Sequence, residues 1–192
     1  MRLVRLAVAG LVGVAVLAGC SDDGQVSETL PSTTRTSASP SATLPPLGPA
    51  DFPVPAEARQ QTPDGAAAFV RYYIDLYNHL LPSLESQPLR DISPGCEVCG
   101  QLAQGLDELK TAHYSYNGGQ LSIRSTGAVR LDGETAQIAF ILDQAPVSVT
   151  DAAGAAVPDR SLASYSLNGG MTLGWESRRQ GWLAKSLTVE RE

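Results

Sequence analysis

All the aromatic side chains of this 192-residue chain lie beyond its first quarter, and this distribution limits where a hydrophobic core can form. No Phe, Tyr or Trp precedes Phe52, so the residues from 51 onward hold all of them. A stretch of about 140 residues is long enough to bury one ordinary core. We therefore predict a single folded domain at residues 51–192, without internal repeats.

The first twenty residues have the pattern of a secretory signal peptide. Arg2 and Arg5 precede the uncharged apolar stretch 6–18, which is too short to span the roughly 30 Å of bilayer hydrocarbon. The sequence then reads Leu-Ala-Gly-Cys, which resembles the bacterial lipobox, where cleavage leaves a lipidated cysteine as the new N-terminus. We expect removal of residues 1–19 and lipidation of Cys20, which would anchor the protein to the extracytoplasmic face of the cell membrane.

The segment that follows the expected anchor has the composition of a disordered linker. Ser, Thr and Pro supply 16 of the 30 residues at 21–50, and such a stretch buries too little apolar surface to offset its ordering entropy. Loss of the signal peptide leaves 12 Lys and Arg against 20 Asp and Glu, a net charge of −8. We therefore expect residues 20–50 to be a lipidated tether, and we expect no nucleic-acid partner.

Two helices are predicted in the first half of the domain. Thr62-Pro63-Asp64 is typical of a helix start, and Pro82 ends the pattern. The apolar residues between them recur at steps of three and four: Ala66, Val70, Tyr73, Ile74, Tyr77, Leu80 and Leu81. A second helix is predicted from about Glu97 to Ala112, after a mostly irregular connection that has room for a short helix.

The second half of the domain is predicted to be a meander of strands. Residues 120–131 and 134–142 flank Asp132-Gly133, which is a strong hairpin signal. Residues 147–149 form a brief strand. Residues 161–177 form one long strand that bends at Asn168-Gly169-Gly170, and residues 182–189 form the last strand. Helices packed on a curved antiparallel sheet give an α+β fold class.

This order of elements resembles the nuclear transport factor 2-like, cone-shaped fold. The stretches TPDGAAAFVRYYIDLYN and ISPGCEVC are also similar to a family of uncharacterised actinobacterial lipoproteins. The resemblance covers residues 55–192 and the signal peptide. It implies a fold and a compartment, and it implies no activity.

The Cys96-x-x-Cys99 motif has three interpretations. A zinc site needs four ligands, and only His79 and His113 are available beside the pair, so we predict no metal. Lipidation of Cys20 would leave only Cys96 and Cys99, and a pair of cysteines outside the cytoplasm favours a structural disulfide. A redox-active pair remains the alternative, although Glu97 between the cysteines opposes thiolate formation and no strand precedes the motif.

The resemblance to the cone-shaped fold implies a pocket between the first helix and the concave sheet, with Tyr114 and Tyr116 at its open end. Its candidate lining residues are the aromatic residues Tyr73, Tyr77, Tyr114, Tyr116 and Trp175. Asp75, His79, His113 and Asp143 are isolated titratable residues, and no spacing typical of a catalytic group links them. We therefore predict no catalytic residue and no cofactor.

The sequence leaves three functional hypotheses. The first is a non-catalytic envelope lipoprotein that binds a small apolar ligand or an envelope protein. The second is an isomerase- or dehydratase-type enzyme that uses the cone pocket, and the third is a thiol-disulfide oxidoreductase. A carboxylate in a closed apolar cavity would favour the enzyme, whereas an interior filled by Phe69, Tyr73, Trp175 and Trp182 would favour the binding protein.

Overall fold

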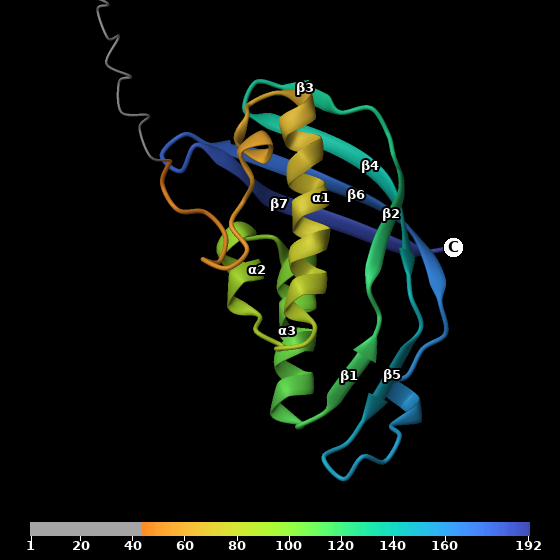
Figure 1. Cartoon of the computed structure of the whole chain (residues 1–192). Coiled ribbons are helices and arrows are strands. Elements are labelled where there is room, and N and C mark those ends of the chain that lie inside the picture. Colours follow the sequence, from red (N-terminus) through yellow and green to blue (C-terminus); the bar gives the residue numbers. More distant parts are fainter. Residues whose placement is uncertain (1–43) are drawn as a thin grey trace, which may run out of the picture. The chain divides into compact units, whose positions relative to one another are not determined.

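The computed structural model describes residues 44–192, in which helices pack on a curved antiparallel sheet (Figure 1). The predicted signal peptide, Cys20 and most of the predicted linker lie outside the described residues. Within residues 44–192, no helix combines the length and the apolar character that a bilayer crossing requires.

The first helix, α1 (Pro63–Leu80), confirms the predicted helix start and end. The Thr62 hydroxyl accepts a hydrogen bond from the Gly65 amide at 3.0 Å, and this cap satisfies one of the free amides of the first turn. The predicted apolar stripe is buried except for Tyr77, which is half-buried. Helix α1 therefore lies along the concave face of the sheet with its apolar side inward (Figure 1).

The second predicted helix is α3 (Glu97–Thr111), and the connection before it contains the short helix α2 (Gln87–Ile92). Cys96 is the N-cap of α3, and its sulfur accepts a hydrogen bond from the Cys99 amide at 3.3 Å. Helix α2 contacts α1 and α3, and both α2 and α3 pack against the last strand.

The main sheet has the strand order β2-β4-β6-β7, with β3 paired to the other end of β4. Its strands are β2 (Leu121–Thr126), β3 (Arg130–Asp132), β4 (Thr135–Gln144), β6 (Tyr165–Glu176) and β7 (Gly181–Arg191). Residues of β4 alternate between exposed and buried, with Ala136, Ile138, Phe140 and Leu142 facing the core. The α+β class and the Asp132-Gly133 hairpin are both confirmed.

The predicted strand 120–131 is wrong as a single element, because it is divided into β2 and β3. Opposite β4, the chain holds one extra residue between Ile123 and Ser125, and a second between Thr126 and Arg130. Each extra residue is a bulge, and bulges bend and twist a strand. These two irregularities add to the curvature of the sheet.

The long strand β6 runs without a break through the Asn-Gly-Gly sequence, but it starts at Tyr165 and not at residue 161. A Cβ at Gly169 would lie 2.2 Å from Cε2 of Phe140 on the neighbouring strand. Gly169 therefore makes room for a core aromatic ring. The residues just before β6 instead border the short 3₁₀ helix η2 (Pro158–Arg160), and Leu162 forms a bridge with Val147.

A separate two-stranded ribbon consists of β1 (Ser115–Gly118) and β5 (Val147–Thr150). The second of these was predicted and is confirmed, whereas β1 was missed. The ribbon lies next to the C-terminal end of α3 (Figure 1).

The boundary predicted between linker and domain is also too late. Leu47 is buried, and its carbonyl accepts a hydrogen bond from the Val54 amide at 2.9 Å. Gly181 allows this packing, because a Cβ there would lie 2.5 Å from a methyl carbon of Leu47. Residues 44–50 therefore belong to the folded unit.

Candidate ligand pocket

An open pocket of about 420 Å³ lies between α3, the C-terminal part of α1 and the start of β6. Its apolar lining residues, which we call the apolar side, are Leu102, Leu106, Leu109, Val147 and Leu162. Its polar lining residues, which we call the polar side, are Tyr77, Gln101, Tyr116, Gln144, Asp159, Arg160 and Tyr165. We call this site the tyrosine pocket. Its volume lies in the range of about 300–1,000 Å³ that is usual for small-molecule sites.

The apolar side arises from the helical periodicity of α3. Leu102, Leu106 and Leu109 follow one another at steps of four and three, so their side chains share one face of the helix. Gly105 lies among them and lines the pocket, and a Cβ added there would meet no atom within 4 Å. The missing side chain of Gly105 therefore contributes to the open space.

The polar side joins residues that are far apart in the sequence. Tyr77 comes from α1, Tyr116 from β1 and Tyr165 from β6. The Tyr165 hydroxyl donates a hydrogen bond to Oε1 of Gln144 at 2.7 Å, and the Arg191 guanidinium lies 4.1 Å from the centre of the Tyr165 ring. These two contacts fix the orientation of Tyr165.

Burial keeps the tyrosine hydroxyls protonated. Burial and then the neighbouring Tyr116 raise the pKa of Tyr77. Burial also raises the pKa of Tyr116, and the Tyr77 hydroxyl offsets part of that rise. At neutral pH both residues are therefore neutral hydrogen-bond donors.

Tyr73 lies one turn of α1 before Tyr77 and is only 1% exposed. Its hydroxyl has no hydrogen-bond partner among residues 44–192. Burial raises the pKa of Tyr73 to about 12, and the nearby Ser93 hydroxyl offsets part of this rise. Tyr73 also contributes to the raised pKa of Tyr77, so the two hydroxyls are neighbours.

The position of the Tyr116 side chain depends on a nearby glycine, Gly119. Gly119 has a φ of +76°, and a Cβ there would lie 2.2 Å from the Tyr116 hydroxyl oxygen. The Tyr116 side chain therefore lies against the bare backbone of Gly119.

The structure does not bring all the candidate pocket residues together. Tyr77 and Tyr116 line the tyrosine pocket, while Tyr73 lies in the core near Tyr77. Tyr114 precedes β1 and is not among the lining residues. Trp175 packs edge to face on Trp182, with 5.2 Å between ring centroids, so it belongs to a different part of the domain.

Sequence reasoning missed Tyr165, Gln144 and the leucines of α3 as pocket residues. The spacing of the leucines predicts an apolar helix face, but it does not show that part of this face is left open. Tyr165 and Gln144 are cross-strand neighbours in β6 and β4, and only the strand register brings them together.

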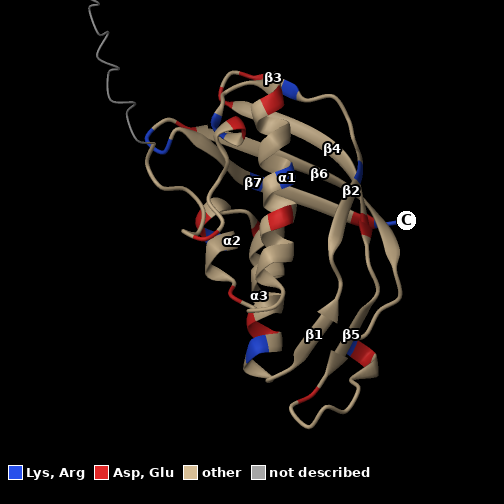
Figure 2. Ribbon diagram, in the orientation of Figure 1, with Lys and Arg blue, Asp and Glu red and all other residues tan. Residues whose placement is uncertain are grey.

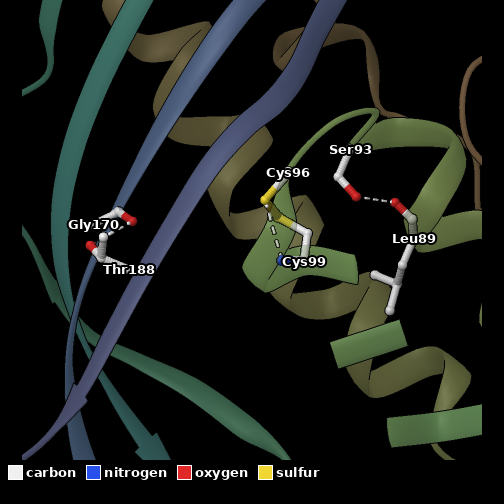
Figure 3. The surroundings of a disulfide bond; sticks show 6 residues. All are labelled: Leu89, Ser93, Cys96, Cys99, Gly170 and Thr188. Carbon is white, nitrogen blue, oxygen red and sulfur yellow. Dashed lines mark hydrogen bonds between the residues drawn. A yellow bond between two sulfur atoms is a disulfide. The ribbon is translucent and has the colours of Figure 1, made fainter. Parts of the chain in front are cut away.

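Cys96 and Cys99 form a disulfide across the first turn of α3, with 5.3 Å between their Cα atoms (Figure 3). Cys96 is 4% exposed and Cys99 is fully buried. The Ser93 hydroxyl donates to the Leu89 carbonyl just before the disulfide, as Figure 3 also shows. The sulfur atoms therefore offer little surface to an attacking thiolate.

The isolated titratable residues have local partners or face solvent. His79 pairs with Asp51 at 3.0 Å, and this hydrogen bond lowers the pKa of Asp51. Asp143 pairs with Arg124 and accepts a hydrogen bond from Ser166 at 2.8 Å. Asp75 is exposed.

His113 is exposed after α3, with a φ of +55°. No group of three or more His, Cys, Asp or Glu residues within 44–192 is arranged to hold a metal ion. Charged residues of both signs are spread over the helices and loops (Figure 2).

A second open pocket, of about 430 Å³, lies between α1 and the segment 51–57. Its walls carry charges of both signs, from Asp51, Glu57, Arg71 and Asp75. Phe52 stacks on His79 with 4.6 Å between ring centroids, and the Tyr72 hydroxyl donates to the Phe52 carbonyl at 2.9 Å. These contacts hold the N-terminal segment on the outer side of α1.

Solved structures share the fold at low sequence identity. The intermembrane space region of the chloroplast protein ARC6 is 16% identical, with a TM-score of 0.50 over 69% of this chain and 99% of that chain. The protein Aln2 from a Streptomyces species is 14% identical, with a TM-score of 0.41 over 64% of this chain and 87% of that chain. At these identities the similarity concerns the fold alone.

A nuclear transport factor 2-like superfamily protein from Salmonella enterica is 11% identical, with a TM-score of 0.41 over 62% of this chain and 85% of that chain. No curated protein matches the sequence. The model of one protein family, described as a family of unknown function (DUF6318), matches residues 51–188.

Proposed function

The chain belongs to the DUF6318 family of unknown function, and we propose that its domain is a non-catalytic binding module for a small, mainly apolar ligand. The tyrosine pocket is the observation that carries the proposal. It combines an apolar helix face with three tyrosines that come from three other elements, and an apolar wall with a few polar groups is the usual composition of a small-molecule site.

The interior of the domain favours binding over catalysis. Phe69, Tyr73 and Trp182 are buried and fill the space between α1 and the sheet, so the pocket is confined to one end. An isomerase-type site needs a carboxyl group in an apolar cavity. The buried polar residues within 44–192 are Ser86 and Ser93, and the one carboxylate that lines the pocket, Asp159, is exposed.

The burial of both cysteines argues against the oxidoreductase hypothesis. Thiol-disulfide exchange requires a thiolate to approach one sulfur atom along the disulfide axis. Since Cys99 is fully buried and Cys96 nearly so, the disulfide is better suited to holding the start of α3.

The proposal also places the domain at the outer face of the cell membrane, held by a lipid on Cys20. The support for this anchor is the sequence pattern of residues 1–20. A Cys20→Ser variant tests it. We expect the wild-type protein to enter the detergent phase and to show acyl chains on Cys20 by mass spectrometry. An unmodified Cys20 in a cytosolic product would contradict the anchor without bearing on the pocket.

Ligand binding is tested with N-phenyl-1-naphthylamine, an apolar fluorophore without a carbonyl group. We expect saturable binding to the full-length protein. The variant Gly105→Leu should weaken binding at least about tenfold, because the new side chain enters the open space.

Gly100→Leu is the matched control, because Gly100 lies in the same helix and also has no atom within 4 Å of an added Cβ, but does not line the pocket. Equal binding by both variants, or no binding by the wild type, would contradict the proposed function.

A further inference from the structure

Four of the six tyrosines of the chain gather at the C-terminal end of α1. Tyr77, Tyr116 and Tyr165 line the tyrosine pocket, and Tyr73 lies in the core beside Tyr77. They come from one helix and two strands that are not neighbours in the sequence. Packing alone would be served equally well by Phe, so the shared hydroxyl group needs its own explanation.

The hydrogen bonds within this cluster do not use all of the tyrosine hydroxyl groups as donors. Among residues 44–192, the Tyr165 hydroxyl is engaged with Gln144, whereas the Tyr73 hydroxyl has no partner. The hydroxyls of Tyr77 and Tyr116 are neighbours, and both residues line the pocket. Even when these two share one hydrogen bond, one of their two protons remains for an acceptor outside the protein.

The charges at the mouth of the pocket select against an anionic ligand. Arg160 is the one cation that lines the pocket, and its guanidinium lies 3.8 Å from a carboxylate oxygen of Glu108. Asp159 lines the pocket next to it. An anion would therefore meet a cation that is already paired, and the two nearby carboxylates would repel it.

The apolar side sets the shape of the ligand. The leucines at 102, 106 and 109 lie on one face of a single helix, so they form one apolar wall of the pocket, whereas the tyrosines come from other elements. A flat ring system can lie against this wall while an oxygen atom at its edge points to the hydroxyls.

We propose that the tyrosine pocket recognises a flat, neutral molecule through a carbonyl oxygen, which accepts a hydrogen bond from Tyr77 or Tyr116. This inference rests on the proposed binding function and adds the chemical class of the ligand. A carbonyl group fits because it only accepts hydrogen bonds, and the two residues have donors to offer. Tyr77 and Tyr116 are then the residues that determine specificity.

The experiment compares two naphthalene probes. Prodan, 6-propionyl-2-dimethylaminonaphthalene, is neutral and carries a carbonyl group whose emission shifts to the red when it accepts a hydrogen bond. N-phenyl-1-naphthylamine has a similar size and no carbonyl group. Both are titrated against the full-length protein and the variants Tyr77→Phe, Tyr116→Phe and their combination. Tyr114→Phe is the matched control, since it makes the same chemical change at a residue outside the pocket.

We expect the double variant to bind Prodan about three- to tenfold more weakly than the wild type and to shift its bound emission to the blue. Binding of N-phenyl-1-naphthylamine should change less than about twofold. Tyr114→Phe should change neither probe, and thermal unfolding should show that all variants are folded.

Each other outcome has a distinct meaning. If the double variant weakens both probes equally, or weakens neither, the carbonyl inference is wrong while the binding function stands. If the wild type binds N-phenyl-1-naphthylamine but prefers it to Prodan, the inference is again wrong. If the wild type binds neither probe, the proposed function fails, and this inference fails with it.

Discussion

The two ends of α1 contrast in how the space beside them is used. Near its N-terminus, Trp182 is fully buried, packs against Trp175 and donates from Nε1 to the Gln60 carbonyl at 2.8 Å. Near its C-terminus, Tyr77 and Tyr116 border an open pocket. The N-terminal end is therefore filled, and the indole of its largest side chain has its hydrogen bond. The C-terminal end borders open volume and has a tyrosine hydroxyl left to donate. The contrast indicates that stability depends mainly on the tryptophan end and recognition on the tyrosine end.

The largest effect that would sharpen this contrast is expected for Trp182→Ala. Removing a fully buried indole leaves a cavity and leaves the Gln60 carbonyl without its hydrogen bond, so the free energy of unfolding should fall by about 3–5 kcal/mol. Tyr116→Ala should lower the free energy of unfolding much less, because the Tyr116 side chain borders an open pocket. Denaturant titration of both variants measures the difference, and similar losses for the two would remove the contrast.

A smaller loss is expected when the disulfide is removed in the variant Cys96→Ser/Cys99→Ala. The closed loop is short, so the cross-link contributes about 2 kcal/mol, and Ser at position 96 can still cap α3. Binding of N-phenyl-1-naphthylamine in the tyrosine pocket should be unchanged. A loss of binding in a folded variant would show that the two regions are coupled.

Alkaline pH should act on the tyrosine end. The pKa of Tyr73 is raised from 10 to about 12 in the folded protein, so its contribution to stability is complete below pH 10 and is lost as the pH rises towards 12. At about one pH unit above 10, the wild-type protein should have lost roughly 1 kcal/mol of unfolding free energy that the Tyr73→Phe variant keeps. Thermal unfolding at a series of pH values measures this, and parallel curves for the two proteins would refute it.

The smallest effect concerns the glycines of α3. Gly100→Ala and Gly105→Ala should each stabilise the protein by about 0.5–1 kcal/mol, because both glycines are helical and an added Cβ meets open space. Calorimetry should give similar gains at the two positions. A gain at Gly100 alone would mean that the pocket is more crowded around Gly105 than the contacts indicate.

The sequence predicts those parts of the fold that depend on neighbouring residues. Thr62 and Pro63 mark the start of α1, and Asp132-Gly133 marks the hairpin, because capping and turn formation are local. The division of residues 120–131 was not predictable, since it results from two extra residues opposite β4. Strand β1 was missed because its Asn117-Gly118 sequence is typical of a turn, and only pairing with β5 makes it a strand.

The candidate site was predictable only in part for the same reason. Tyr77 follows from the helix pattern, and Tyr116 was named as a residue of the open end. Tyr165 reaches the pocket through the register between β4 and β6, which pairs it with Gln144. Trp175 was assigned to the pocket from its aromatic character, yet its pairing with Trp182 places it near the other end of α1.

Because Tyr116 lies so close to Gly119, the residue at position 119 limits where the Tyr116 ring can lie. Even one methyl group there would overlap the phenol oxygen, so the ring would have to change position, and the positive φ would also strain the new residue. A position that contributes no side chain thus helps to set the shape of the pocket, because it determines where one of the lining rings can lie.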